Sequence, residues 1–389
     1  MSLASGSKES KNKKKKSSVN NKNSRMTSVE GDGSGKKNKN SAKGSESKSS
    51  SKKDPTYEDA REAIKNTIGW MTQTQAKSGG LLGYFKSATF ERDPPENHKT
   101  YAFQANRSKN RNPDFPLYDH SRVRLKIEEE TDNNYINATN VSCPSCERKW
   151  IVAQHPMEKH FEDFWKMVFY QEIDVIYAIF SPDEQLPMYF PTEQGKFVNH
   201  GQFFVHCWKT APSAGRYQAN SYTIEVLPAG CSNARYTTIL HYPHWPKGHV
   251  APGAKVVLKG ILALDPADKV TKGKCLIHSS EGINRAMCFV MVDYVIDLMF
   301  RNNTVDIQEL ITQLRSQRGG AFQNRIFCLF SLYVVIEYVK IRLTKVQSAP
   351  DVLVEINNLQ KQMRIEFAGI TPKESGNSRK GATNEGTAD

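Results

Sequence analysis

The stretch 277–285, Ile-His-Ser-Ser-Glu-Gly-Ile-Asn-Arg, combines residue types that bind anions. It follows an apolar run, Cys275 to Ile277, that predicts a short buried strand, and it precedes a predicted buried helix from Arg285 to about Phe300. A strand that leads through a tight turn into a helix directs backbone N–H groups and the positive end of the helix dipole to one place. Arg285 adds a guanidinium that can hold two phosphate oxygens. The turn alone is weak support for an anion site, and a purely structural turn is the alternative.

The elements that must position this turn follow two patterns. Between about Tyr101 and Gly260, short apolar runs separated by turn residues predict strands of a mixed sheet. The runs are Lys149 to Val152, Val175 to Phe180, Gln202 to Val205, Ser221 to Val226 and Tyr236 to Leu240. After Ala254 the pattern becomes helical, which predicts an α/β (α+β) domain.

Helical spacing of apolar residues predicts four further helices. One begins after the capping pattern Thr56-x-x-Asp59 and buries Ala60, Ile64, Ile68 and Met71. Another contains Ile307, Leu310, Ile311 and Leu314 and ends at Gly319-Gly320. A third runs from about Arg325 to Lys340, and Val352 to Phe367 forms an amphipathic stretch. This last stretch either packs back onto the domain or meets a partner helix.

The positive charge of the chain is concentrated at one end. The 389 residues carry a formal net charge of +13, but residues 1–54 alone contain 15 basic and five acidic side chains. We therefore expect a disordered Lys/Ser/Asn-rich tail (1–54), one domain (55–346), an amphipathic C-terminal helix (347–370) and a second disordered tail (371–389). The rest of the chain is near neutral, so no specific nucleic-acid binding is predicted. The lysine block around 11–16 indicates nuclear import, weak attraction to anionic surfaces or a solubilising arm.

Membrane, metal and disulfide signals are weak. The best apolar run, Phe327 to Val339, is too short to span a bilayer and is interrupted by Glu337. Seven scattered cysteines describe no disulfide framework, which favours the cytoplasm or the nucleus. Cys143 and Cys146 have the spacing of half a zinc site, but two loop thiols are the favoured interpretation. We predict no metal and no cofactor.

The 277–285 turn resembles the signature loop of the protein tyrosine phosphatases, His-Cys-x-x-Gly-x-x-Arg followed by Ser or Thr. Further blocks in the family's order are Lys109-Asn110-Arg111 with Tyr118 to Val123, Asn134 to Ala138, Ile151 to Pro156 with Phe164 to Val168, Trp245-Pro246-Lys247, and Arg315 to Arg318 with Gln323. The resemblance covers nearly the whole expected domain. It implies a highly twisted mixed sheet flanked by helices and a site for phosphotyrosine.

Four departures from the family's pattern fall on the positions that carry its chemistry. Ser279 stands where the family has its nucleophilic cysteine, and Lys247 stands where it has the aspartic general acid. Ala286 replaces the hydroxyl after the arginine, and Phe327 replaces the glutamine that positions the hydrolytic water. A serine hydroxyl is protonated at neutral pH, and a lysine is a poor acid there. The sequence therefore predicts a chain that is not an enzyme, an inactive homologue or pseudophosphatase.

The phosphate-binding positions are better preserved. The predicted ligands are Ser279, Ser280, Glu281, Gly282, Ile283, Asn284 and Arg285. Asn284 replaces a glycine, and we expect it to tolerate a positive φ. Replacing a thiolate with a hydroxyl removes a negative charge, whereas the Glu281 carboxylate repels phosphate if it faces inward and is harmless if it faces outward.

The resemblance also gives four substrate-recognition positions: Asn112, Asp114, Trp245 and Gln323. Asn112 takes the place of the tyrosine that stacks on the phosphotyrosine ring, which weakens recognition. The leading hypothesis is that the chain binds a phosphotyrosine or phosphate-mimicking segment of a signalling partner, a kinase or a kinase substrate, as a trap, shield or regulator. The alternatives are a phosphate-independent scaffold that uses its surface and tails, and a phosphatase with residual activity.

Overall fold

The computed structural model describes residues 57–87, 98–127, 133–146, 148–213, 215, 218–262, 274–301, 303 and 305–369. The predictions for the two tails and for the cap at Thr56 lie outside these residues. In the described part no helix combines the length and the apolar character needed to cross a membrane.

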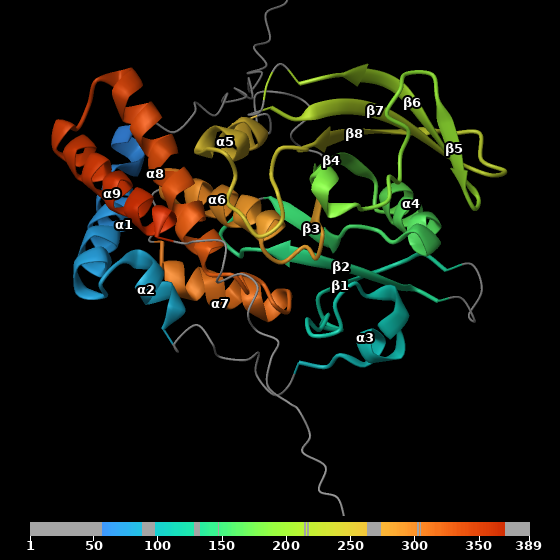
Figure 1. The fold of residues 1–389 in the computed structure, drawn as a ribbon, viewed down its shortest axis with the longest axis horizontal. Helices are drawn as coiled ribbons and strands as arrows, with labels where there is room; N and C mark the ends of the chain where they lie inside the picture. Colours follow the sequence, from blue (N-terminus) through green and yellow to red (C-terminus); the bar gives the residue numbers. More distant parts are fainter. Residues whose placement is uncertain are drawn as a thin grey trace, which may run out of the picture. The chain divides into compact units, whose positions relative to one another are not determined.

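The strands of the described residues form one mixed sheet with the order β1-β2-β3-β9-β4-β8-β7-β6-β5 (Figure 1). Their bounds are β1 Arg122–Arg124, β2 Tyr135–Ser142, β3 Lys149–Gln154, β4 Ile173–Ile179, β5 Phe197–His200, β6 Phe203–Ala211, β7 Asn220–Pro228, β8 Arg235–His241 and β9 Lys274–Ser279. The central strands β3, β9, β4 and β8 are parallel, and the flanking pairs are antiparallel. The predicted mixed sheet flanked by helices is confirmed.

The burial of each strand explains whether its sequence pattern predicted it. β3, β4 and β9 are buried on both faces, so they appear as continuous apolar runs. β7 and the first half of β6 alternate between buried and half-exposed residues, as strands with one solvated face do. The apolar runs did not predict β1, β2 and β5. The edge strands β1 and β5 are short and bury few side chains, and β2 has polar residues, Asn137 and Thr139, at buried positions.

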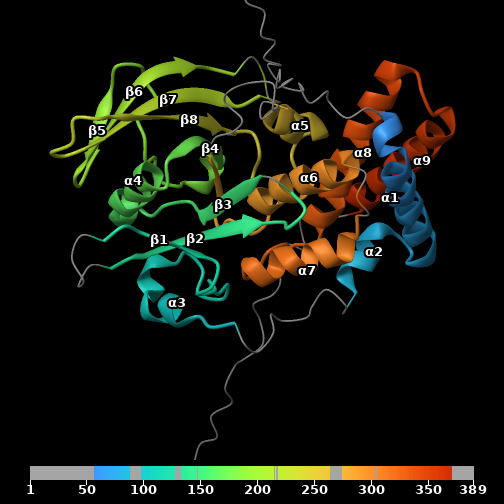
Figure 2. The same cartoon turned by 180° about the vertical axis from the view of Figure 1, so that it is seen from behind.

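Helices pack on the sheet and on one another. Their bounds are α1 Tyr57–Lys77, α2 Leu81–Lys86, α3 Tyr101–Ala105, α4 Phe161–Tyr170, α5 Ala254–Leu262, α6 Arg285–Phe300, α7 Ile307–Gln317, α8 Ile326–Val346 and α9 Pro350–Ala368. Figures 1 and 2 show α1, α8 and α9 together at the end of the domain away from β5, β6 and β7. α6 is buried on nearly all sides, as its apolar sequence predicts.

The amphipathic stretch in α9 packs back onto the domain. Its residues Val352, Ile356, Leu359 and Met363 are buried in the same core cluster as α1, α6 and α8. The Glu366 carboxylate of α9 also accepts hydrogen bonds from the backbone N–H groups of residues 81 and 82, which open α2. Of the two alternatives for this stretch, the structure shows the first.

Candidate functional site

The turn that follows β9 lies at the carboxyl end of the central parallel strands. β9 ends at Ser279 and α6 begins at Arg285, so the residues between them connect the centre of the sheet to the most buried helix. In open sheets of this kind, ligands bind at the carboxyl ends of the parallel strands. The structure therefore places the predicted anion turn where a ligand site is expected.

The backbone of this turn is oriented by its surroundings. Every carbonyl of residues 279–283 accepts a hydrogen bond from the surrounding framework. His155 N donates to Ser279 O and Ser280 O (2.8 and 3.2 Å), Arg318 donates to Glu281 O and Gly282 O (3.0 Å each), and Phe322 N donates to Ile283 O (2.7 Å). In a planar trans peptide, the carbonyl and the next N–H point in opposite directions. The N–H groups of residues 280–284 therefore point away from the framework, to the inside of the turn.

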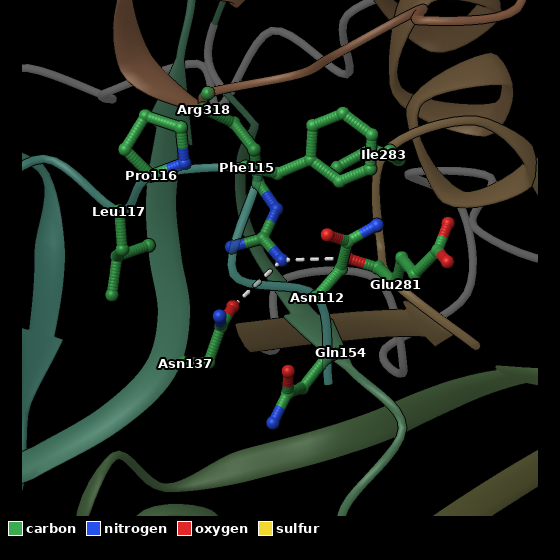
Figure 3. A pocket seen from close by; sticks show the side chains of 10 residues that line it. Asn112, Phe115, Pro116, Leu117, Asn137, Gln154, Glu281, Ile283 and Arg318 are labelled. Atoms are coloured by element: carbon green, nitrogen blue, oxygen red, sulfur yellow. Dashed lines mark hydrogen bonds between the residues drawn. The ribbon is translucent and has the colours of Figure 1, made fainter. Parts of the chain in front are cut away.

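Arg318 is the main support of this geometry. Its guanidinium is buried, and besides the two turn carbonyls it donates to Asn137 Oδ1 at 2.9 Å (Figure 3) and to Thr139 Oγ1 at 2.9 Å. Burial lowers its pKa to about 10, so the group stays charged at neutral pH. A buried cation that binds only neutral oxygens adds positive potential behind the turn, which favours an anion inside it.

Two residues of the turn show why the backbone can follow this path. Gly282 has a φ of +70°, and a Cβ there would lie 2.2 Å from the carbonyl oxygen of Ala153, so only glycine fits. Asn284 has a φ of −115°, so the tolerance of a positive φ that we expect of an asparagine is not used here. Its side-chain Oδ1 instead accepts a hydrogen bond from Asn324 N at 3.1 Å and links the turn to the segment before α8.

Arg285 is held in place by a buried carboxylate. Its Nη1 and Nη2 donate to the two Glu184 carboxylate oxygens at 2.6 Å each, and Nη1 also donates to the Trp245 carbonyl at 2.6 Å. The side chains of Arg285 and Glu184 are only 3% and 5% exposed. A guanidinium has five N–H donors, so these contacts leave Nε–H and one Nη2–H. These two donors form the edge that can hold two oxygens of one oxyanion.

A cavity of about 80 Å³ opens in front of this turn; we call it the cradle cavity. It is lined by Lys247, Gly248, Ser279, Ser280, Glu281, Ile283, Asn284, Arg285 and Phe327. A second cavity beside it is lined by Asn112, Phe115, Pro116, Leu117, Asn137, Gln154, Glu281, Ile283, Arg318 and Gly319 (Figure 3). Glu281 and Ile283 belong to both cavities, so together the two cavities bring most of the predicted site residues side by side.

Lys247 and Glu281 form an ion pair at the cradle cavity. Lys247 Nζ donates to Glu281 Oε1 at 3.1 Å, and the two side chains are 56% and 22% exposed. The Glu281 carboxylate points away from Arg318 and Asn112 in Figure 3. The carboxylate is directed to Lys247, and the ammonium of this lysine partly neutralises its negative charge.

The loop that carries Lys247 is anchored by Trp245. The indole is fully buried, stacks with Phe327 at a centroid distance of 6.5 Å, and its Nε1 donates to His249 O at 2.7 Å. Among the predicted recognition residues, Trp245 thus contributes its backbone carbonyl to Arg285 and does not line either cavity. Ala286 lies fully buried in the first turn of α6.

Among the described residues, no hydrogen bond joins the Ser279 hydroxyl to a basic side chain. A hydrogen bond of 2.7 Å joins Nε2 of the neighbouring His278 to the Tyr189 hydroxyl, and Nδ1 of His278 has no partner among the described residues. Burial, reinforced by the nearby His155, keeps the pKa of His278 well below its usual range, so its ring is neutral at pH 7. The structure therefore contains no Ser279–His278 pair.

Of the remaining predicted recognition residues, one lines the second cavity and two line neither cavity. Asn112 lines the second cavity, and its Oδ1 accepts a hydrogen bond from Asp114 N at 2.8 Å. Asp114 and Gln323 are exposed and line neither cavity. Elsewhere, Cys143 and Cys146 are buried in a turn, and in the described part of the chain no three His, Cys, Asp or Glu side chains gather as a metal would require.

Sequence reasoning missed the residues that support the site from behind. Arg318 was noted only as part of a resembling block, and Glu184 was not considered. The one local signal for Glu184 is the pattern Ser181-Pro-Asp-Glu184, which forms a capping box. That pattern explains a helix start and gives no hint that the same carboxylate binds an arginine 101 residues away.

Comparisons with known proteins agree with this architecture. Residues 106–337 match the family model described as protein-tyrosine phosphatase. The chain is 28% identical over 249 residues to mouse tyrosine-protein phosphatase non-receptor type 2, which covers 62% of this chain and 60% of the relative. It is 27% identical over 254 residues to the tyrosine phosphatase-like protein J1 of Microplitis demolitor bracovirus. This alignment covers 60% of this chain and 82% of the viral protein. It is 28% identical to the rat receptor-type tyrosine-protein phosphatase zeta over 259 residues. This alignment covers 63% of this chain and 11% of the rat protein.

The chain thus spans about 60% of the length of the mouse relative and a small part of the receptor-type one. The family match covers more than half of the chain and includes the sheet, the 279–285 turn and most of α8. On this sequence match and this fold, the chain belongs to the protein-tyrosine phosphatase family.

Proposed function

We propose that this chain binds the phosphate group of a phosphotyrosine segment in a signalling partner without hydrolysing it. The observation that carries the proposal is the hydrogen bonding of the turn: the carbonyls of residues 279–283 all accept hydrogen bonds from the framework, so the N–H groups of residues 280–284 point to the inside of the turn, beside the cradle cavity. The remaining donor edge of Arg285 completes an oxyanion site. Phosphotyrosine is the favoured form because the relatives are named tyrosine phosphatases.

Loss of hydrolysis is supported by the replacement of two groups: the nucleophile that attacks the phosphorus atom in this family and the acid that protonates the leaving oxygen. Ser279 takes the position of the nucleophilic cysteine, and its hydroxyl has no base, because His278 is neutral and bonded to Tyr189. Lys247 takes the position of the general acid and is paired with Glu281. A lysine ammonium is a much weaker acid than a carboxyl group and donates protons poorly, which forfeits a contribution of roughly 10²- to 10⁴-fold in rate.

Two further positions support the same conclusion. Ala286 offers no hydroxyl after Arg285, and the Phe327 ring lines the cradle cavity with an apolar surface. Neither side chain has a polar atom that positions a water molecule. Because four groups are replaced together, a compensating change at any one of them does not restore the reaction. The chain then acts as a trap, shield or regulator of a kinase or kinase substrate, in the cytoplasm or the nucleus.

Calorimetry with phosphotyrosine peptides and with inorganic phosphate tests the proposal. We expect saturable binding by the parent protein, loss of binding in Arg285→Ala, and no change in Arg61→Ala. Arg61 is an exposed arginine of α1 and is paired only with Glu58 at 3.8 Å among its described contacts, so it controls for the loss of a positive charge. If the parent does not bind, or if Arg285→Ala binds as the parent does, the proposal is wrong.

A second candidate is a scaffold that ignores phosphate. Two observations favour it: the Glu281 carboxylate lines the cradle cavity, and Asn112 offers no ring for stacking. This function predicts that partner binding survives phosphatase treatment of the partner and excess vanadate. Phosphate-dependent binding that Arg285→Ala removes eliminates it.

A further inference from the structure

The mouth of the cradle cavity carries a pair of opposite charges on two separate segments. Lys247 lies on the loop after β8, and Glu281 lies in the turn after β9. Their side chains meet at 3.1 Å, and both line the cavity. The pair therefore lies where a ligand must pass or bind.

Each charged side chain that lines the cavity has a partner of opposite charge. Arg285 is paired with Glu184, and Lys247 is paired with Glu281. The first pair is almost fully buried and is fixed by three short hydrogen bonds. The second is largely exposed at Lys247, so it is screened by water and easily broken. Of the two pairs, the second is the one that a ligand can rearrange.

Resting on the proposed phosphate binding, we propose that Lys247 is a direct ligand of the phosphate dianion and that Glu281 is its exchangeable counter-ion in the empty site. A lysine ammonium on a flexible stem can turn from one oxygen to another without movement of the backbone. In the exchange, Lys247 leaves a carboxylate of charge −1 for a phosphate of charge near −2. The released carboxylate is repelled from the phosphate and turns to solvent.

This exchange makes the site selective for the charge of its ligand. A carboxylate that enters the cavity offers Lys247 no more charge than Glu281 already does, so replacing one with the other gains nothing. A phosphate dianion attracts the ammonium about twice as strongly at equal distance. The proposal therefore narrows the ligand class to phosphate esters and excludes glutamate or aspartate mimics of phosphotyrosine.

A double-mutant cycle separates a ligand from a counter-ion. Lys247→Ala alone is ambiguous, because it also leaves Glu281 unpaired in the cavity. In a Glu281→Gln background that ambiguity disappears. If Lys247 binds phosphate, adding Lys247→Ala to Glu281→Gln weakens binding of a phosphotyrosine peptide by roughly three- to tenfold, and Glu281→Gln alone binds more tightly than the parent. Lys255→Ala in the same background removes an exposed lysine of α5 that does not line the cavity, and it should leave binding unchanged.

Equal binding by Glu281→Gln and by the Lys247→Ala/Glu281→Gln double variant overturns the inference while leaving the proposed function intact. A peptide with glutamate in place of phosphotyrosine provides the second arm. We expect the parent to bind it at least tenfold more weakly than the phosphopeptide; equal affinity for the two peptides contradicts the inference. Failure of the proposed function has a different signature, since the parent and Arg285→Ala would then not differ.

Discussion

Ser279 and Lys247 show at the residue scale why anion binding and hydrolysis are separable. An oxyanion is held by backbone N–H groups and a guanidinium, and the 279–285 turn supplies both with the help of Arg318 and Glu184. Cleavage of a phosphate ester also needs a nucleophile and a proton donor. The proposed function requires that the chain keep the first set of groups, and Ser279 and Lys247 replace the second.

Restoring the nucleophile alone should restore little hydrolysis. In Ser279→Cys, the inward N–H groups and Arg285 favour the thiolate, but the leaving tyrosyl oxygen still has no acid. We expect only slow turnover of a phosphotyrosine peptide by Ser279→Cys, and a rate roughly 10²- to 10⁴-fold higher for Ser279→Cys/Lys247→Asp. The measurement is release of inorganic phosphate. Equal rates for the two variants contradict the roles given to these positions.

At the scale of elements, the loop after β8 is joined to α8 by aromatic packing. Trp245 and Phe327 are both fully buried and stack on each other, and Trp245 also contacts Phe330 of α8. The residue that lines the cradle cavity with an apolar surface therefore also fixes the loop that carries Lys247. Position 327 is in this way part of the core as well as part of the site.

Truncation of Phe327 should therefore be costly. Phe327→Ala removes a buried ring between Trp245 and the core and should lower the free energy of unfolding by about 3–5 kcal/mol. Phe327→Leu keeps most of the volume and should cost clearly less. Urea titration followed by Trp fluorescence compares the two. A loss below about 1 kcal/mol in Phe327→Ala shows that this packing is unimportant.

Helix α6 could be predicted from the sequence, whereas the contact of Glu184 with Arg285 could not. The bounds of α6 were predicted correctly, because a strand, a turn and an unbroken apolar run are local patterns. The edge strands and the negative φ of Asn284 were not predicted, since they depend on neighbouring elements. The partner of Arg285 lies 101 residues away, and a contact of that separation leaves no periodicity in the chain.

For the molecule as a whole, buried histidines link stability to pH. Burial lowers the pKa of His155 to about 3, lowers that of His278 well below its usual range, and lowers that of His241. The rings of His155 and His278 are neutral in the folded state at pH 5–7, and His241 binds its proton at a lower pH in the folded state than in the unfolded chain, where all three bind protons below about pH 6.5. The unfolded state then holds more protons, so stability falls as the pH decreases from 6.5 toward 3.

Thermal unfolding at several pH values measures this effect. Each such group contributes up to about 1.4 kcal/mol per pH unit within its window, so we expect a clear fall in Tm between pH 6.5 and 5. Burial raises the pKa of Asp293, so this one group adds stability as the pH falls, whereas the three histidines together remove it. His155→Gln should make the fall less steep. A Tm that is constant or rises on acidification contradicts this prediction.

Phosphorus-31 NMR of a phosphotyrosine peptide mixed with the 389-residue protein is the decisive experiment, because one spectrum reports both binding and hydrolysis. We expect the phosphotyrosine resonance to shift or broaden on addition of the parent protein and not on addition of Arg285→Ala, while no inorganic phosphate signal grows over hours. An unshifted resonance contradicts the binding, and a growing inorganic phosphate signal that Ser279→Ala removes contradicts the loss of hydrolysis.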